Sequence, residues 1–280
     1  MSGFLDAMAA ASHQRLAQAR HREPFGALER RAQAMPPAPP LRLSAGGFDV
    51  IAELKLRSPA QGVLGSAQDD WQGRVRSYAH GGAAAVSVLT EPSRFDGSLE
   101  HLQRASEILT PLGVPAMRKD FLVDPYQLLE ARVAGAGGAL LIVRMLEPGR
   151  LAEMLEVAAV HGLFILLEAF DEEDLMAAQQ VLGALAARLR PSPSAPVLLG
   201  VNCRDLQTLK VLPERFETLA AKLPVSWPAV AESGVASAAD AIRIQRLGFR
   251  LALIGTALMS RDDPQQLLQE IFAATRTVQS

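Results

Sequence analysis

The sequence predicts an α/β protein, a (β/α)8 TIM barrel with an N-terminal helical extension. Eight short apolar runs recur between residues 48 and 254, and each is followed by a stretch with helical periodicity. The runs are nearly continuous in Val, Ile, Leu and Ala, which is typical of parallel strands buried on both faces. The length of 280 residues suits one barrel. No GxGxxG turn follows the first run, which disfavours a doubly wound open sheet.

The residues before the first run are predicted to form the helical extension. Residues 4–35 place apolar side chains among polar ones at helical spacing: Phe4, Leu5, Met8, Leu16 and Phe25. The proline-rich stretch 36–40 then ends any helix and stiffens a short spacer. The apolar stripe favours docking over a free tail, for example as a lid across the barrel mouth. We therefore expect an extension over 1–45, packed on a catalytic barrel over 46–280.

The barrel elements follow in order. Strands are predicted at 48–54, 84–89, 114–117, 138–143, 164–167, 197–201, 228–231 and 251–254. Helices are predicted between them, for example over 124–134, 148–161 and 236–247. The stretch 186–196 is rich in Pro and Ser, and its segment 191–196 adds length there, so it is predicted to be an exposed loop. Because an αβ loop lies opposite the chemistry of a barrel, we expect it to be functionally neutral.

Composition excludes several classes of protein. A net charge of −2 gives no global field for nucleic acid or an anionic membrane, and the longest apolar run is too short to span a bilayer. The histidines show no metal-ligand spacing, so no metal site is expected. Cys203 is the single cysteine, which excludes an intrachain disulfide and suits a small packing role in a reducing compartment. We expect a cytoplasmic protein, as a monomer or weak homodimer.

Charged and polar residues stand where the predicted strands end. Glu53 and Lys55 lie two residues apart, so they share one face at the C-terminal end of the first strand. That end carries the chemistry in α/β barrels. The alternative is a structural ion pair. The later strand ends favour chemistry, because they add Lys119, Glu168 and Asn202 to the same rim.

Each of these later residues has a structural alternative. The charged neighbours of Lys119, Arg118 and Asp120, can rotate outward, but Lys119 could also be a solvated lysine at a strand end. Glu168 ends an apolar strand and suits general acid/base work, or it could pair with a lysine of the rim. Arg204 could bind a substrate carboxylate through its planar fork, or pair with Asp205 or a loop backbone.

The last two strands end in a pattern that indicates phosphate binding. The chain reads Glu232-Ser233-Gly234 after the seventh strand and Gly255-Thr256 after the eighth. Barrels often hold phosphate with the loops after these two strands. Glycines let backbone N–H groups approach an anion, and the hydroxyls add donors. Either pair alone is a common turn, but both at these strand ends favour a phosphate site.

Together the strand ends resemble those of the indole-3-glycerol phosphate synthase family. The matching strings are IAELKLRSP, SVLTEPSRFDGS, MRKDFLVDPYQ, LLEAF, GVNCRDL, AESGV and LIGTALM, in family order over residues 48–260. The resemblance implies ring closure and decarboxylation of 1-(2-carboxyphenylamino)-1-deoxyribulose 5-phosphate, without a cofactor. The products would be indole-3-glycerol phosphate, CO2 and water, in tryptophan biosynthesis.

The same resemblance implies roles for individual residues. Lys119 matches the general acid that protonates the substrate ketone, and Glu168 and Lys55 match the pair that removes the hydroxyl. Glu53 would orient the lysines and Asn202 would hold a substrate hydroxyl. The implied substrate-binding residues are Ser58, Ser233, Gly234, Gly255 and Thr256 for phosphate, Arg204 for the anthranilate carboxylate, Phe95, Phe121 and Leu141 for the ring, and Glu232.

Two alternative functions remain at this point. A paralogue could act on a modified anthranilate-ribulose phosphate in a specialised pathway, and a non-catalytic barrel could keep only the phosphate cradle. The second is disfavoured because both Lys119 and Glu168 are present. The sequence departs from the family pattern at Gln61, Asp96 and Cys203, and Asp96 lies closest to the expected anthranilate side.

Overall fold

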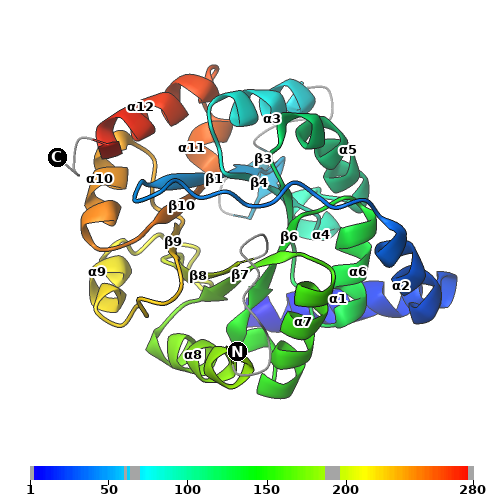
Figure 1. Ribbon diagram of the computed structural model, residues 1–280. Coiled ribbons are helices and arrows are strands. Elements are labelled where there is room, and N and C mark those ends of the chain that lie inside the picture. The colour runs from blue at the N-terminus through cyan, green and yellow to red at the C-terminus, as the bar shows by residue number, and fades with distance from the viewer. Residues whose placement is uncertain (1–2, 60–61, 64–69, 187–195, 277–280) are drawn as a thin grey trace.

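The computed structural model describes residues 3–59, 62–63, 70–186 and 196–276, and it confirms the predicted barrel (Figure 1). Eight parallel strands close in the order β1-β10-β9-β8-β7-β6-β5-β4. They are β1 (Asp49–Leu54), β4 (Ala85–Leu89), β5 (Ala116–Lys119), β6 (Gly138–Ile142), β7 (Phe164–Ala169), β8 (Val197–Asn202), β9 (Ala229–Glu232) and β10 (Leu251–Ile254). A two-stranded hairpin after β1, β2 (Arg57–Ser58) with β3 (Gly62–Val63), was not predicted.

Helices surround the strands and cover their outer faces (Figure 1). Ser98, Asp124 and Ser237 begin three of them by accepting backbone N–H groups of the first turn. No helix among the described residues is long and apolar enough to cross a membrane. The helices after the extension are α3 (Trp71–His80), α4 (Pro92–Phe95), α5 (Leu99–Leu109), α6 (Pro125–Val133), α7 (Pro148–Val160), α8 (Glu172–Ala186), α9 (Glu214–Ala220), α10 (Ala238–Arg246), α11 (Thr256–Met259) and α12 (Pro264–Arg276).

The predicted boundaries of the barrel strands hold to within two residues at every end, and β5 is shifted by two residues at both ends. It was expected at 114–117 and lies at Ala116–Lys119. Pro115 has no N–H for the ladder, so regular pairing starts after it. The strand then continues to Lys119, which pairs in register with Leu89 of β4.

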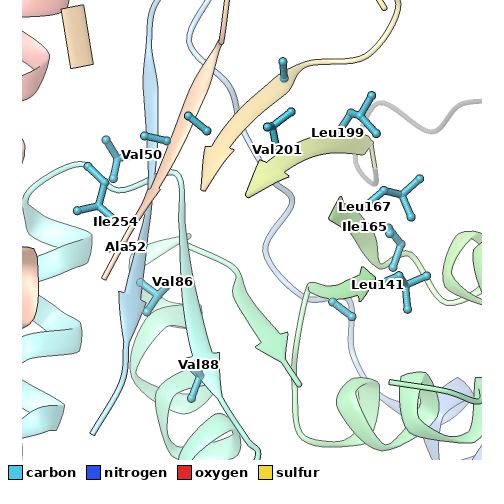
Figure 2. Close-up of a cluster of buried hydrophobic side chains, with 14 of the residues drawn as sticks. Val50, Ala52, Val86, Val88, Leu141, Ile165, Leu167, Leu199, Val201 and Ile254 are labelled. Atoms are coloured by element: carbon cyan, nitrogen blue, oxygen red, sulfur yellow. The ribbon is translucent and has the colours of Figure 1, made fainter. Parts of the chain in front are cut away.

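Strand alternation divides the core into two layers. Residues such as Ile51, Leu166 and Val230 point into the barrel. Their neighbours in sequence point outward and pack under the helices. Figure 2 shows this outer layer, which includes Val50, Val86, Leu141, Ile165, Leu167 and Val201. The inner layer reaches the C-terminal strand ends, where polar residues replace the apolar ones.

The predicted helical extension consists of two helices. They are α1 (Gly3–Arg22) and α2 (Phe25–Ala34). Pro24 separates them, because it disfavours helical backbone at the preceding residue. The Tyr126 hydroxyl contacts the carbonyl oxygens of Ala19 and Glu23, at 3.1 and 2.9 Å, at the end of α1. This end of α1 is therefore held against α6.

The extension contacts both ends of the barrel. Leu5 and Met8 of α1 pack in the same cluster as the barrel interior and Phe121, at the C-terminal strand ends. The spacer after α2 crosses the barrel (Figure 1), and its Leu41 joins the inner cluster with Leu251. The predicted neutral loop at 186–196 lies outside the described residues, apart from Ala186 and Pro196.

Candidate active site

A cavity of about 540 Å³ opens at the C-terminal ends of the strands. It is the place where chemistry is expected in a barrel of this kind. The structure brings almost all of the sequence-predicted residues to its wall: Glu53, Lys55, Ser58, Phe95, Lys119, Phe121, Glu168, Asn202, Arg204, Glu232, Ser233, Gly234, Gly255 and Thr256. Residues from many strand ends therefore share one pocket.

Glu53 and Lys55 share one face, as their spacing predicts, and they also form the ion pair that was the structural alternative. The Lys55 Nζ lies 2.7 Å from Glu53 Oε1, and both side chains are largely buried. Gly255 makes room for the pair, because a Cβ there would lie 2.3 Å from Glu53 Oε1. The ion pair does not reduce the two residues to a structural role, because both side chains also line the cavity.

Lys119 lies between two carboxylates from other strands. Its Nζ is 3.7 Å from Glu168 Oε2 and 3.4 Å from Glu232 Oε2. The lysine side chain is 15% exposed and the carboxylates are more deeply buried, so the pairs are only weakly screened by solvent. Lys119 is not the solvated lysine of the structural alternative. Instead, its ammonium faces the cavity and is paired with two carboxylates that also line it.

The pKa values of this cluster follow from burial and charge. Burial alone would lower the pKa of Lys119, but Glu168, Glu232 and Glu53 together raise it above its ordinary value. Burial would raise the pKa of Glu53, but Lys55 and Lys119 hold it below its ordinary value. Burial and the charge of Glu168 raise the pKa of Glu232 to about 8, although Lys119 opposes the shift. At neutral pH the cluster thus holds an ammonium, which is the form a proton donor needs.

Asn202 connects this cluster to the β9 end. Its amide nitrogen donates to Glu168 Oε1. Its amide oxygen accepts the Ser233 hydroxyl at 3.0 Å and the Arg204 backbone N–H at 2.9 Å. These bonds fix the amide orientation and keep Glu168 turned toward Lys119.

Gly200 is a further residue that supports the site and that the sequence reading did not single out. It pairs with Val230 in the β8–β9 ladder, and a Cβ on it would lie 2.1 Å from Glu232 Oε1. Glycine therefore leaves space inside the barrel for the Glu232 carboxylate. That oxygen is buried and has no hydrogen-bond partner among the described residues.

Ser233 and Gly234 form a tight turn at the end of β9. Both have positive φ, at 67° and 71°. Such a conformation is uncommon for serine and costs of order 1–3 kcal/mol, so surrounding contacts must hold it. The bond from Ser233 to Asn202 is one of these contacts. The turn lies beside Gly255 and Thr256, which begin α11 after the neighbouring strand.

Aromatic rings form one wall of the cavity. The Phe121 ring lies 6.2 Å from Phe95 and packs edge-on against Phe4 at 5.9 Å. Phe4 comes from α1 and was not proposed as a pocket residue, although it belongs to the apolar stripe of the extension. Phe170, after β7, also lines the cavity and was missed.

The prediction that Leu141 contacts the substrate ring is wrong. Leu141 points outward and is buried between the barrel and the helices (Figure 2). Its neighbours Leu140 and Ile142 line the cavity instead. Side chains alternate along β6, so a choice shifted by one residue selects the opposite face.

Arg204 lines the cavity and also makes the backbone contact that the sequence left open. Its Nη1 donates to the Leu209 carbonyl at 2.8 Å. Leu209 has a positive φ of 60°, so the arginine holds an unusual turn in the loop after β8. The guanidinium keeps further N–H donors that a ligand could use.

Of the two charged neighbours of Lys119, Arg118 turns outward from the barrel as expected, whereas Asp120 lines the cavity. Arg118 and Asp120 are each 3% exposed. Arg118 lies on the helix-facing side of β5 and donates to the Gln127 carbonyl at 2.7 Å and to Glu130 at 3.1 Å. Alternation points it away from the cavity, but α6 covers that face. A buried polar network therefore supports the strand end.

No group of three or more residues suited to hold a metal ion occurs in the described part of the chain. Cys203 is fully buried, as expected of a packing residue. Burial raises its pKa to about 11, so its thiol is a poor nucleophile at neutral pH.

Comparison with known proteins identifies the family. The sequence model of the indole-3-glycerol phosphate synthase family matches residues 5–271. The chain belongs to the indole-3-glycerol phosphate synthase family. A relative of that name from Nocardioides sp. is 41% identical over 235 residues, covering 84% of both chains. One from Salinibacter ruber is 38% identical over 240 residues, covering 84% of this chain and 82% of the relative.

Solved structures of other enzymes share the fold of this synthase family member. A 3-hexulose-6-phosphate synthase from Salmonella typhimurium aligns with a TM-score of 0.62 at 13% identity, covering 82% of this chain and 99% of that one. A thiamine phosphate pyrophosphorylase from Pyrococcus furiosus aligns with a TM-score of 0.58 at 14% identity, covering 83% and 98%. At such identities the similarity shows the barrel alone.

Proposed function

We propose that this chain converts 1-(2-carboxyphenylamino)-1-deoxyribulose 5-phosphate to indole-3-glycerol phosphate, CO2 and water, in tryptophan biosynthesis. Membership of the synthase family supports this reaction. The observation that carries it in the structure is the position of the Lys119 ammonium, 3.7 Å from Glu168 and facing a cavity with an aromatic wall. Such a pocket can hold an aromatic ring beside a proton donor.

The first step is closure of the five-membered ring. The ring carbon that bears the carboxylate attacks the ketone carbon, and the ketone oxygen takes a proton from Lys119. The cation stabilises negative charge as it develops on that oxygen, an effect that often dominates catalysis. Loss of CO2 then leaves its electron pair in the ring and restores aromaticity.

The second half of the reaction removes the new hydroxyl as water. An acid protonates the leaving oxygen, and a base takes a proton from the neighbouring carbon, so that the indole double bond forms. Glu168 and Lys55 are the proposed pair, because both face the cavity. Glu53 holds Lys55 in place. Asn202 orients Glu168 and offers a contact to a substrate hydroxyl.

The phosphate is proposed to bind around the ends of β9 and β10. Ser58, Ser233, Gly234, Gly255 and Thr256 line the cavity there and supply hydroxyls and backbone N–H groups. Glu232 is proposed to contact the sugar chain between this site and Lys119. We further propose that the protein acts in the cytoplasm without a cofactor, as a monomer or weak homodimer.

The direct test is an assay with the purified protein. Mixing it with the carboxyphenylamino sugar phosphate should produce the fluorescence and ultraviolet absorbance of an indole, together with one CO2 for each product. Protein that binds the substrate but releases neither product would refute the proposed reaction. Turnover of a ring-substituted anthranilate derivative in strong preference to the parent would favour a specialised paralogue.

Arg204→Ala should weaken binding of the carboxylated substrate far more than binding of inorganic phosphate. A charge-assisted pair with a carboxylate is worth about 1.5–3 kcal/mol, so KM should rise roughly tenfold or more. Arg204→Lys keeps the charge and should recover part of the loss. Binding of both ligands can be followed by titration calorimetry. Equal losses for both would show that Arg204 acts only through its bond to the Leu209 carbonyl.

A further inference from the structure

We propose that Arg15, in helix α1 of the extension, is a positioning residue for the reaction assigned above, on which this inference rests. Arg15 does not line the cavity. Its guanidinium instead bridges two buried carboxylates that follow β4 and β5. The Nη2 atom lies 2.7 Å from Asp120 Oδ1, and Nη1 lies 3.4 Å from Glu91 Oε1. The planar fork of arginine suits a bridge between two acids.

The contact with Asp120 fixes the backbone on either side of it. Asp120 directly follows Lys119 and precedes Phe121, whose N–H donates to Asp120 Oδ1 at 2.8 Å. The other carboxylate oxygen accepts the Thr90 hydroxyl at 2.8 Å. Thr90 also donates its N–H to the Lys119 carbonyl at 3.0 Å. Arg15 therefore holds the segment from which the ammonium and one wall ring project.

The contact with Glu91 holds the short helix α4. Glu91 accepts the backbone N–H groups of Ser93 and Arg94, at 2.9 and 2.7 Å, and so begins that helix. Phe95 at its end lines the cavity and packs against Phe121. Through two carboxylates, Arg15 thus fixes the relative positions of the general acid and two aromatic rings.

Burial explains why a cation is needed here. The Glu91 side chain is 0% exposed and the Asp120 side chain is 1% exposed. Buried carboxylates are costly unless they are paired and hydrogen-bonded. The Nη2 atom of Arg118 lies 3.3 Å from Asp120 Oδ2, but the same guanidinium also donates to the Gln127 carbonyl of α6. Arg15 is the cation that contacts both acids.

Helix α1 offers a matched control in Arg20. Its Nη2 lies 2.7 Å from Asp124 Oδ1, the same distance as the Arg15 contact with Asp120. Asp124 begins α6 and does not line the cavity. Both arginines dock the same helix, but only Arg15 contacts a residue that adjoins Lys119. Comparing variants of the two arginines therefore distinguishes an effect on the position of Lys119 from an effect on the packing of the extension.

The experiment compares Arg15→Gln, Arg15→Lys and Arg20→Gln in the full chain. Arg15→Gln should lower kcat by between about tenfold and 10²-fold, because a shift of about 1 Å in a reacting group has that effect. Arg15→Lys should recover part of the loss. Arg20→Gln should lower the thermal midpoint to a similar extent while kcat stays within about twofold of wild type.

A second readout keeps this test separate from that of the proposed reaction. The substrate analogue with its ketone reduced to an alcohol cannot cyclise, and it should bind Arg15→Gln more weakly because the ring wall is displaced. Inorganic phosphate should bind all variants equally. Wild-type protein that binds the analogue without turning over substrate would refute the proposed reaction. The analogue affinities of Arg15→Gln and Arg20→Gln would then still decide whether Arg15 positions the ring wall. Arg15→Gln matching Arg20→Gln in kcat and in analogue affinity would overturn the inference.

Discussion

Lys119→Met is expected to abolish measurable turnover while weakening binding of the reduced analogue only about tenfold, the worth of one charge-assisted hydrogen bond. The variant removes both the proton donor and the charge that stabilises the ketone oxygen as it becomes negative. General acid catalysis alone contributes about 10²–10⁴-fold, and electrostatic stabilisation adds to it, so kcat should fall by about 10³-fold or more. Single-turnover assays for CO2 and indole, with titration calorimetry for the analogue, measure both quantities.

Stability must be checked because the change leaves Glu168 and Glu232 without their cation. The raised pKa of Glu232 lets this carboxyl become neutral, which limits the cost of the substitution. Circular dichroism and the thermal midpoint report whether the variant is folded. Lys222→Met is the matched control, since Lys222 pairs with Glu172 at the surface. A folded Lys119→Met variant that keeps most activity would discredit the role of Lys119.

Glu168→Gln is expected to lower indole formation by about 10²–10³-fold, because the acid/base group for loss of the hydroxyl is removed. Glutamine has nearly the same shape, and its amide oxygen can still accept the Asn202 bond. Since Glu168 is placed in the second half of the reaction, CO2 should appear faster than indole in a single turnover. In Lys119→Met the two products should slow together.

The surface acid Glu172, at the start of α8, provides the control variant Glu172→Gln. It should match wild type in both products. If Glu168→Gln slows CO2 and indole equally, the carboxylate acts at or before ring closure and the assigned step is wrong. If neither product slows, Glu168 is only a structural partner of Lys119.

Much of this fold could be predicted because each strand carries local signals. At the end of β1 the charged residues Glu53 and Lys55 show which face is inward, so the alternation of side chains predicts both at the cavity mouth. No such mark exists on β6, where every residue is apolar. The choice of Leu141 over Leu140 therefore failed, because only the pairing of neighbouring strands sets which face is inward.

Contacts between distant segments account for the other differences. The burial of Asp120 could not be foreseen, because its partner Arg15 comes from a helix far away in sequence. Gly200 gave no signal either, since its use depends on Glu232 of the next strand.

The most direct measurement is a crystal structure of the protein with the reduced analogue bound. The Lys119 Nζ should lie within about 3.2 Å of the hydroxyl that replaces the ketone, a normal hydrogen-bond distance. The phosphate should meet Ser233, Gly234 and Gly255, and the aromatic ring should contact Phe95. An analogue whose hydroxyl lies beyond the reach of Lys119, with its phosphate bound elsewhere in the mouth, would contradict the account.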